Sequence, residues 1–192
     1  MKDYINILDL CETGTKTLGP GNRYVIWVQG CPFNCKNCTT PESIPIVPNK
    51  MIEIEYIINS ISDNKKIDGI TISGGEPFLQ ASKLSKILQQ VKNNRPELTV
   101  IVYTGFKFNN LDWKEAKDLL NYIDLLIDGQ YIDKLNNNKG LRGSTNQNFI
   151  FLTKKLLKHK ETFISGERNI EIHISNHMKV IVGIPNNQIN IN

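Results

Sequence analysis

The stretch that decides the fold is residues 24–38, which read Tyr-Val-Ile-Trp-Val-Gln-Gly-Cys-Pro-Phe-Asn-Cys-Lys-Asn-Cys. Its first part, 24–28, is a continuous apolar run, typical of a parallel strand that is buried on both faces. Its last part holds three of the four cysteines of the chain in a C-x3-C-x2-C spacing. A cysteine-rich loop is therefore expected at the carboxyl end of a buried strand, where α/β proteins bind their ligands.

The three close cysteines, Cys31, Cys35 and Cys38, predict a metal centre. They cannot all pair with one another, and a disulfide to Cys11 would leave an improbable arrangement. Structural zinc normally has four protein ligands, and no second C-x2-C or H-x3-H pair lies at a finger-like distance. Iron–sulfur clusters usually take four thiolates, so three cysteines leave one iron open to a substrate or cofactor. Zinc or plain buried thiols remain alternatives from spacing alone, and the polar loop with proline and asparagine favours a cluster.

The composition of the whole chain excludes several classes of protein. Its 192 residues, 40% hydrophobic and 22% charged, suit a single globular domain. The formal net charge is +4, but the lysines are spread thinly, and the densest run, 154–160, is more typical of a solvated helix face than of a nucleic-acid site. No apolar run reaches the roughly 18 residues of a membrane span, and Asp3 lies where a signal peptide would be basic. We expect a cytoplasmic protein with reduced thiols and with neither nucleic acid nor membrane as a partner.

Strands and helices alternate along the chain at the length of βαβ units. This rhythm predicts an α/β fold with a parallel sheet and right-handed crossovers. The expected strands are 24–28, 70–72, 98–103 and 123–127, preceded by an edge strand at 4–10. The expected helices are 50–62 with Asn49 as N-cap, 81–94, and one that begins with the capping box Asp112-x-x-Glu115. Residues 133–148 read as loop.

The end of the chain has a different pattern. Residues 168–174 alternate with period two, and a second apolar stretch, 178–184, follows across Ser-Asn-His. This pattern predicts an antiparallel hairpin added after the parallel core. We expect residues 1–150 to form the core domain, and 151–192 to form an extension that packs on it and is not an independent domain.

Short polar or glycine motifs follow three of the predicted strands. They are Gly74-Gly75-Glu76, Thr104-Gly105 and Asp128-Gly129. Because the carboxyl ends of parallel strands meet at one edge, these motifs should lie beside the cysteine loop. The double glycine exposes backbone to a ligand, and Glu76 offers a carboxylate to an ammonium group.

The cysteine spacing together with Gly-Gly-Glu resembles the radical S-adenosylmethionine (SAM) enzymes. The resemblance implies a [4Fe–4S] cluster on Cys31, Cys35 and Cys38, with SAM on the fourth iron. It implies a 5′-deoxyadenosyl radical that abstracts hydrogen, so no side chain is expected to be catalytic. The residues expected to bind the cofactor are Asn37, Gly74, Gly75, Glu76, Thr104 and Asp128, with the Gly-Gly-Glu segment on the methionine end of SAM.

Within that superfamily the chain is most similar to the activating proteins of anaerobic ribonucleotide reductases. The similarity covers roughly residues 4–148 and includes Gly19-Pro20-Gly21 with Arg23, and 142–147, Arg-Gly-Ser-Thr-Asn-Gln. It implies a partial (β/α) barrel of the radical SAM type, mostly of parallel strands and open on one side. It also implies hydrogen abstraction from a glycine of a partner reductase, with a flavodoxin- or ferredoxin-type electron donor.

Some positions depart from the family pattern. Asn37 replaces the aromatic residue that many superfamily members carry, Thr39-Thr40 follows the third cysteine, and the tail after Gln147 is long. Two alternatives therefore stay open. One is a radical SAM enzyme that modifies a peptide or a small molecule, as deazapurine synthases do, and the other is a non-catalytic iron–sulfur or metal-binding module.

Overall fold

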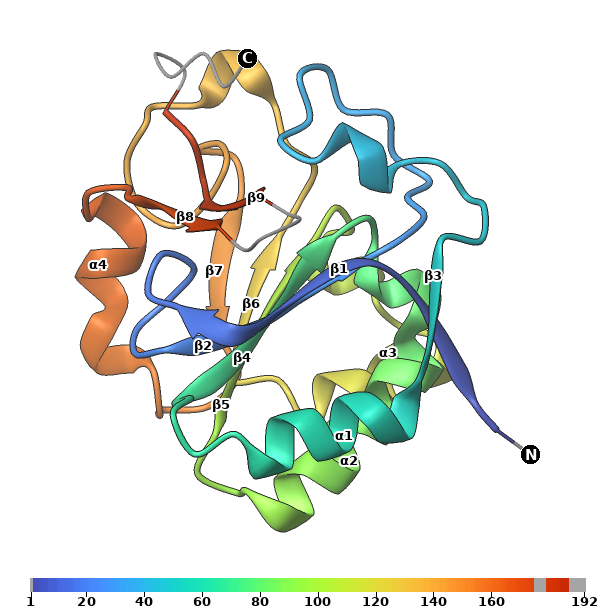
Figure 1. Cartoon of the computed structure of the whole chain (residues 1–192). Coiled ribbons are helices and arrows are strands. Elements are labelled where there is room, and N and C mark those ends of the chain that lie inside the picture. Colours follow the sequence, from blue (N-terminus) through green and yellow to red (C-terminus); the bar gives the residue numbers. More distant parts are fainter. Residues whose placement is uncertain (1, 175–178, 187–192) are drawn as a thin grey trace.

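A seven-stranded sheet forms the centre of the molecule in the computed structural model, which describes residues 2–174 and 179–186 (Figure 1). The strand order is β3-β1-β2-β4-β5-β6-β7. Four neighbouring strands are parallel: β2 (Arg23–Val28), β4 (Gly69–Gly74), β5 (Thr99–Thr104) and β6 (Leu125–Asp128). Antiparallel strands flank them: β1 (Tyr4–Thr15) and β3 (Lys50–Glu53) on one side and β7 (Asn148–Phe151) on the other. The predicted α/β class with a parallel centre is confirmed.

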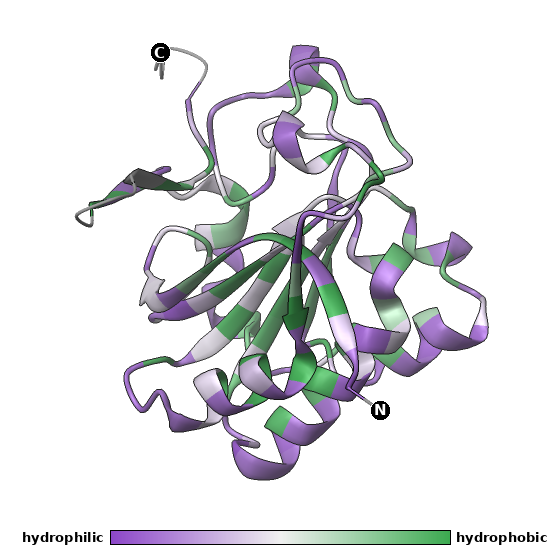
Figure 2. Ribbon diagram, turned by 45° about the vertical axis from the view of Figure 1, so that its right-hand side comes forward, coloured by the Kyte–Doolittle hydropathy of each residue, from purple (hydrophilic) through white to green (hydrophobic). Residues whose placement is uncertain are grey.

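Three helices cover one face of the sheet: α1 (Ile54–Asp63), α2 (Ala81–Asn94) and α3 (Lys114–Leu120). Their apolar stripes pack on alternate strand residues such as Tyr24, Ile26 and Val28, which are fully buried. Figure 2 shows the apolar residues along the strands and the inner sides of these helices, with hydrophilic residues outside. This face is the main core, because helical and strand periodicities meet there.

The opposite face is covered by the end of the chain. Phe163 of α4 (Lys160–Ser165) packs with Leu125 and Ile127 of β6. The antiparallel pair β8 (Ile170–Ile174) and β9 (Lys179–Gly183) follows, so the predicted hairpin is confirmed. The expected turn at 175–177 and the first residue of the second expected stretch, Met178, lie outside the described residues. Short 3-10 turns η1–η5 occupy the connections: Pro41–Ser43, Pro77–Gln80, Phe108–Asn110, Asp133–Leu135 and Leu157–His159.

The first part of the chain differs from the prediction. β1 is longer than expected and is not an edge strand, because β3 pairs with it from Tyr4↔Glu53 to Ile7↔Lys50. The predicted N-cap Asn49 is wrong, and the helix begins only at Ile54. The backbone N–H of Asn49 donates to Asn6 Oδ1 at 2.9 Å, so the residue guides β3 onto the sheet instead. Pairing with β1 overrides the local helical pattern of residues 50–53.

Two further predictions are wrong in detail. The capping box at Asp112 and Glu115 does not form, since α3 begins after Trp113 with no side-chain cap. The Trp113 ring instead packs edge-on against Phe78 and Phe106, which fixes the start of the helix by burial. The expected loop at 133–148 contains the turn η4, and its last residue, Asn148, begins the additional strand β7.

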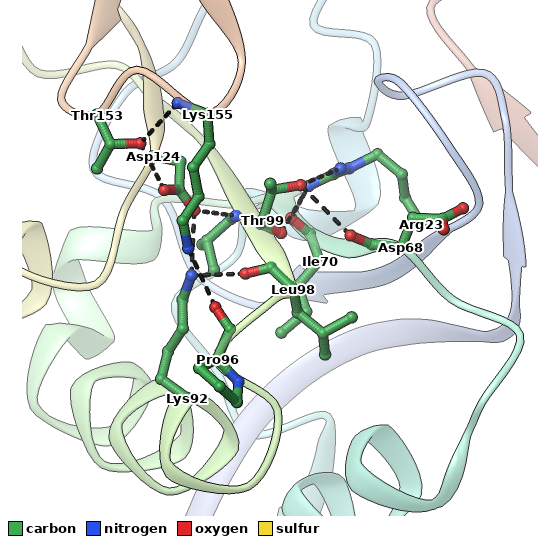
Figure 3. Close-up of polar contacts among 11 residues, drawn as sticks. Arg23, Asp68, Ile70, Lys92, Pro96, Leu98, Thr99, Asp124, Thr153 and Lys155 are labelled. Atoms are coloured by element: carbon green, nitrogen blue, oxygen red, sulfur yellow. Dashed lines mark hydrogen bonds and ion pairs between the residues drawn. The ribbon is translucent and has the colours of Figure 1, made fainter.

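The amino ends of the parallel strands are closed by buried polar groups. Arg23 is fully buried, and its guanidinium donates to Thr71 Oγ1, Ile70 O, Thr99 O, Thr99 Oγ1 and Pro20 O. Burial lowers the pKa of Arg23 to about 10, which leaves it protonated at neutral pH. Figure 3 shows this group beside Asp124, whose carboxylate lies between Lys92 and Thr153. Among the described residues, no helix is long and apolar enough to cross a membrane.

Candidate cofactor site

The cysteine loop leaves the carboxyl end of β2 and is fixed by its own backbone. Gly30 N donates to Ser43 O at 2.8 Å, and Cys31 N donates to Ile44 O at 3.0 Å. Cys38 N donates to Cys35 O at 3.2 Å, which turns the loop back on itself. The loop is therefore closed onto the turn η1.

All three cysteines are free thiols, partly buried in the wall of one pocket. Burial raises the pKa of Cys31 to about 11 and also raises the pKa of Cys38, so in the absence of metal these thiols stay protonated at neutral pH. Cluster binding must then release protons. Within 2–174 and 179–186 no group of three metal-binding side chains is gathered as for a single ion. A [4Fe–4S] cluster binds each thiolate to a different iron, and three free thiols in one wall provide that donor set.

The Gly-Gly-Glu loop is held against the start of the cysteine loop. Gly75 N donates to Val28 O and Glu76 N donates to Gly30 O, each at 2.8 Å. A Cβ atom on residue 75 would overlap Gly30 O, so only glycine allows this approach. The loops after β2 and β4 thus form one rigid edge.

The Glu76 carboxylate joins this edge to the end of β5. The side chain is buried, with 1% of its residue surface exposed. Its Oε1 accepts hydrogen bonds from Phe78 N at 2.9 Å and Thr104 Oγ1 at 2.8 Å, and its Oε2 accepts one from Gly105 N at 2.8 Å. Burial raises the pKa of Glu76 to about 7 although these three donors oppose the shift. The pocket edge therefore contains a carboxyl group that sits between its neutral and charged forms at neutral pH.

Aromatic rings support the cysteine loop from the side of β5. Phe33 of the loop packs edge-on against Phe106, with ring centroids 5.0 Å apart. The Phe33 ring also lies over Gly105, where a Cβ atom would overlap it. Gly105 therefore serves two purposes, since its N–H binds Glu76 and its missing side chain admits Phe33.

The pocket lies at the carboxyl ends of the parallel strands, as the motifs predicted. It encloses about 880 Å³, counting its open mouth, and is lined by residues that include the three cysteines, Gly74, Gly75, Glu76 and Thr104. The hydroxyl of Thr104 is used inside the site, because it donates to Glu76 and accepts from Phe106 N.

Two of the predicted cofactor residues, Asn37 and Asp128, lie beside the pocket lining instead. Asn37 adopts a left-handed backbone with φ of 55°, which asparagine tolerates better than an aromatic residue would, and its Nδ2 donates to Asp133 Oδ2 at 2.8 Å. The buried Asp128 carboxylate accepts from Phe108 N at 2.7 Å and from Asn148 Nδ2 at 2.8 Å. Both side chains therefore hold loops of the rim.

Several lining residues were missed by sequence reasoning. Trp27 and Tyr103 face the pocket from β2 and β5, and Tyr131, Gln147 and Ile184 come from later segments. The position of Tyr103 directly before the Thr104-Gly105 motif at the end of β5 could have identified it. No local pattern identifies the last three as pocket residues, because tertiary contacts alone bring them there.

Cys11 and Arg142 have structural roles outside the cofactor site. Cys11 is buried among apolar side chains, including Val25, and lies outside the pocket lining. Arg142 anchors its own loop, since its Nη1 donates to Gln147 O at 2.8 Å and its guanidinium lies over the Phe149 ring.

Comparison with known proteins agrees with this site. The family described as "4Fe-4S single cluster domain" matches residues 17–150. The chain is 35% identical over 136 residues to the anaerobic ribonucleoside-triphosphate reductase-activating protein of Haemophilus influenzae, covering 67% of this chain and 87% of the relative. The protein of the same name from Enterobacteria phage T4 is 31% identical over 145 residues, covering 73% and 91%. The pyruvate formate-lyase-activating enzyme of Staphylococcus aureus is 29% identical over 153 residues, covering 74% and 60%.

These relatives and the donor set of the pocket point to the same cofactors. Three free thiols on one loop suit a [4Fe–4S] cluster, and the Gly-Gly-Glu edge beside them suits the amino-acid end of SAM. The chain therefore belongs to the 4Fe–4S single cluster family and, within it, to the radical SAM enzymes known as anaerobic ribonucleoside-triphosphate reductase-activating proteins.

Proposed function

We propose that this protein creates a glycyl radical on a partner anaerobic ribonucleotide reductase. The observation that carries the proposal is the pocket in which a C-x3-C-x2-C loop and Gly-Gly-Glu meet. The identity of 35% to a reductase-activating protein supports the choice of partner. The same reasoning makes the substrate a protein segment that contains glycine.

We assign each of the main pocket-lining residues a role in binding the cluster or SAM. Cys31, Cys35 and Cys38 ligate the cluster, and Gly74 and Gly75 present backbone to the methionine end of SAM. Glu76 binds the ammonium group of that end, because its carboxylate is the acidic group of this wall. When bound, the cluster and SAM supply a one-electron cleavage that releases methionine and transfers a glycine Cα hydrogen to the 5′-deoxyadenosyl carbon.

The other predicted cofactor residues are assigned supporting roles. Thr104 orients Glu76 through its hydroxyl hydrogen bond of 2.8 Å. Asn37 holds the cysteine loop against Asp133, and Asp128 holds the rim through Phe108 N. We propose these as positioning residues, which act on the cofactor through the groups that they fix.

The proposal also includes the type of fold, a partial (β/α) barrel. The four parallel strands β2, β4, β5 and β6, with helices on one face, suit a partial (β/α) barrel of the radical SAM type. Four strands are too few to close such a barrel. The open side would admit a loop of a protein substrate, which a closed barrel would exclude.

The cluster needs an external one-electron donor, because one electron leaves it in each cleavage. We propose a flavodoxin- or ferredoxin-type protein for this role, since both carry single electrons at low potential.

The test begins with the anaerobically reconstituted protein reduced with dithionite. We expect 5′-deoxyadenosine from SAM, and an electron paramagnetic resonance signal of a glycyl radical when the partner reductase is added. Cys35→Ala should lose the cluster absorbance and both products. Cys11→Ala is the matched control, because Cys11 is buried away from the pocket and its loss should leave the iron content unchanged.

Three outcomes would contradict parts of the proposal. A verified cluster without SAM cleavage would indicate a non-catalytic iron–sulfur module. Cleavage without a glycyl radical on the reductase, together with modification of a peptide or small molecule, would indicate a different radical SAM substrate. Equal iron content in wild type and Cys35→Ala would remove the cysteine loop from the metal site.

A further inference from the structure

The segment that follows the family match forms part of the pocket. The match ends at residue 150, yet Gly183 and Ile184 line the same cavity as the three cysteines and Glu76. These two residues come from the end of β9 and the residue after it. A wall of the pocket is therefore built from a part of the chain that the family description does not include.

This wall packs on the face of the sheet opposite α1 and α2. Val182 is fully buried and Ile184 is 9% exposed, in one apolar cluster with Leu18 and Val25. Trp27 and Tyr103, which also line the pocket, pack against this cluster. In Figure 1 the hairpin lies across the sheet from the three helices. Ile184 thus continues an apolar surface that β2 and β5 begin.

Hydrogen bonds connect the residues before the hairpin to the loop that leads to the pocket rim. Arg168 is buried, and its guanidinium donates to Gly140 O at 3.0 Å and to Lys139 O at 3.2 Å. Gly140 N returns a hydrogen bond to Gly166 O, and Leu141 N donates to Phe163 O, each at 2.8 Å. These bonds hold the loop whose later residues reach the pocket rim.

The hairpin is tied a second time to the loop after β1. Glu171 Oε1 accepts a hydrogen bond from Lys16 N at 3.1 Å. Burial opposes ionisation of Glu171, yet hydrogen bonds from Thr15, Lys16 N and His173 lower its pKa, so the carboxylate stays charged at neutral pH. With anchors at Arg168 and Glu171, the segment is a fixed part of the wall.

We propose that residues 163–174 and 179–184 form a built-in wall that shields the reacting atoms, and that Ile184 is the residue that closes it. The inference rests on the proposed function, because it needs a radical that must be kept from other hydrogen donors. With this side covered, the substrate glycine enters from the rim between the cysteine loop and residues 129–147. Small thiols are kept out, since Ile184 lies at the pocket in the apolar cluster against which Trp27 and Tyr103 pack.

The first test measures access to the wall without any cofactor chemistry. In a Trp113→Phe background, Trp27 is the remaining tryptophan, and its fluorescence is quenched by acrylamide. Ile184→Ala removes side-chain volume beside Trp27 and should raise the quenching constant roughly twofold, because a gap at an open pocket stays accessible. Ile174→Ala is the matched control, since Ile174 is in the same hairpin but 79% exposed. Ile184→Val, which keeps most of the side chain, should lie between wild type and Ile184→Ala.

The second test measures which hydrogen the radical takes. The reconstituted enzyme turns over with its partner reductase in D₂O with dithiothreitol, whose S–H group exchanges to S–D. Transfer from glycine gives unlabelled 5′-deoxyadenosine, whereas transfer from the thiol breaks S–D, forms C–D and leaves a thiyl radical. We expect Ile184→Ala to increase the deuterated product severalfold, and Ile174→Ala to match wild type.

The outcomes separate this inference from the function it rests on. If Ile184→Ala leaves either the quenching constant or the deuterated fraction at the wild-type value, the shielding wall is wrong while the activase assignment stands. If wild type makes no 5′-deoxyadenosine at all, the proposed function fails, and unchanged quenching would then reject the wall as well.

Discussion

Two buried carboxyl groups lie at opposite ends of the parallel strands and differ in their partners. Glu76, 1% exposed, follows β4 at the pocket, and Asp124, 2% exposed, precedes β6 at the other end. Glu76 accepts three hydrogen bonds from neutral donors. Asp124 accepts from Val100 N at 2.8 Å and Thr153 Oγ1 at 2.6 Å, and its third partner is the Lys92 ammonium at 3.1 Å. One cationic donor is the difference between them.

The pKa values follow from that difference. Burial acts against ionisation of both groups, but the hydrogen bonds and the Lys92 charge hold the pKa of Asp124 below its usual range. Burial raises the pKa of Glu76 to about 7, and within the described part of the chain no cation forms an ion pair with it. A buried carboxyl group without a cation, in the wall of a pocket, is typical of a ligand site. At the amino ends of the parallel strands, the charge of Asp124 is already balanced by Lys92. At the carboxyl ends, Glu76 is suited to bind the ammonium group of a ligand.

The largest effect is expected from removing the cation of the complete pair. Lys92→Met leaves Asp124 buried without its charge partner, which should lower the free energy of unfolding by about 3–5 kcal/mol. Lys86→Met on the same helix is the control, because Lys86 is half exposed in its contact with Asp3 and should cost at most about 1 kcal/mol. Urea unfolding of the metal-free protein measures both, and equal losses would contradict the buried pair.

The next effect is the pH dependence that Glu76 adds to stability. Folded Glu76 keeps its proton up to about pH 7, whereas in the unfolded chain it loses the proton near 4.5. The folded state therefore binds an extra proton between these values, and its stability falls as pH rises through them, by up to ~3 kcal/mol. The measurement is urea unfolding of wild type and Glu76→Gln from about pH 5 to pH 8. The wild-type decrease should be absent in Glu76→Gln, and parallel curves would contradict the raised pKa.

Asp124→Asn provides a comparison without pH dependence for the same experiment. Because the folded pKa of Asp124 is lowered, its contribution is present above the unfolded pKa and is lost as pH falls through the folded value. Asp124→Asn should therefore be less stable than wild type by a constant amount from about pH 5 to pH 8.

A smaller effect is expected on ligand binding. Glu76→Gln keeps the size of the side chain but removes the charge that we assign to the ammonium group of SAM. Affinity of the reconstituted protein for SAM should fall about tenfold, or ~1.4 kcal/mol, at a pH above 7. Equilibrium dialysis under anaerobic conditions measures it, with the exposed Glu55→Gln on α1 as the control. Unchanged affinity for SAM in Glu76→Gln would contradict the assignment of the Glu76 charge to the ammonium group of SAM.

Sequence patterns predicted the parallel centre of the fold because its signals are local. The apolar runs at 24–28 and 98–103, each followed by a glycine motif, place strands and their carboxyl ends without knowledge of contacts. The same patterns failed at β3 and α3, where a neighbour decides the structure. Pairing with β1 extends residues 50–53, and packing of Trp113 starts α3.

The site was predicted to a similar degree. The cysteines and Gly-Gly-Glu are motifs, and they meet as expected. Asp124 has a cation because Lys92 of α2 reaches the amino end of β6 from 32 residues away, which no spacing rule contains. Among the described residues Glu76 has no such partner. The position of Ile184 in the pocket wall depends on how the hairpin packs on the sheet. The alternating pattern of the hairpin sequence predicts only that these residues form strands.

The smallest effect concerns the neutral donor that holds Glu76. Thr104→Val removes a hydroxyl that donates to Glu76 Oε1 at 2.8 Å and leaves Phe106 N without its acceptor, so a loss of about 1 kcal/mol in stability is expected. Because this hydrogen bond favours the charged carboxylate, its loss should also move the pH midpoint of the Glu76 effect upward. Thr104→Ser keeps the hydroxyl and should restore the wild-type midpoint. A midpoint that stays unchanged in Thr104→Val would mean that burial alone sets the pKa of Glu76, and that Thr104 only fills space between β4 and β5.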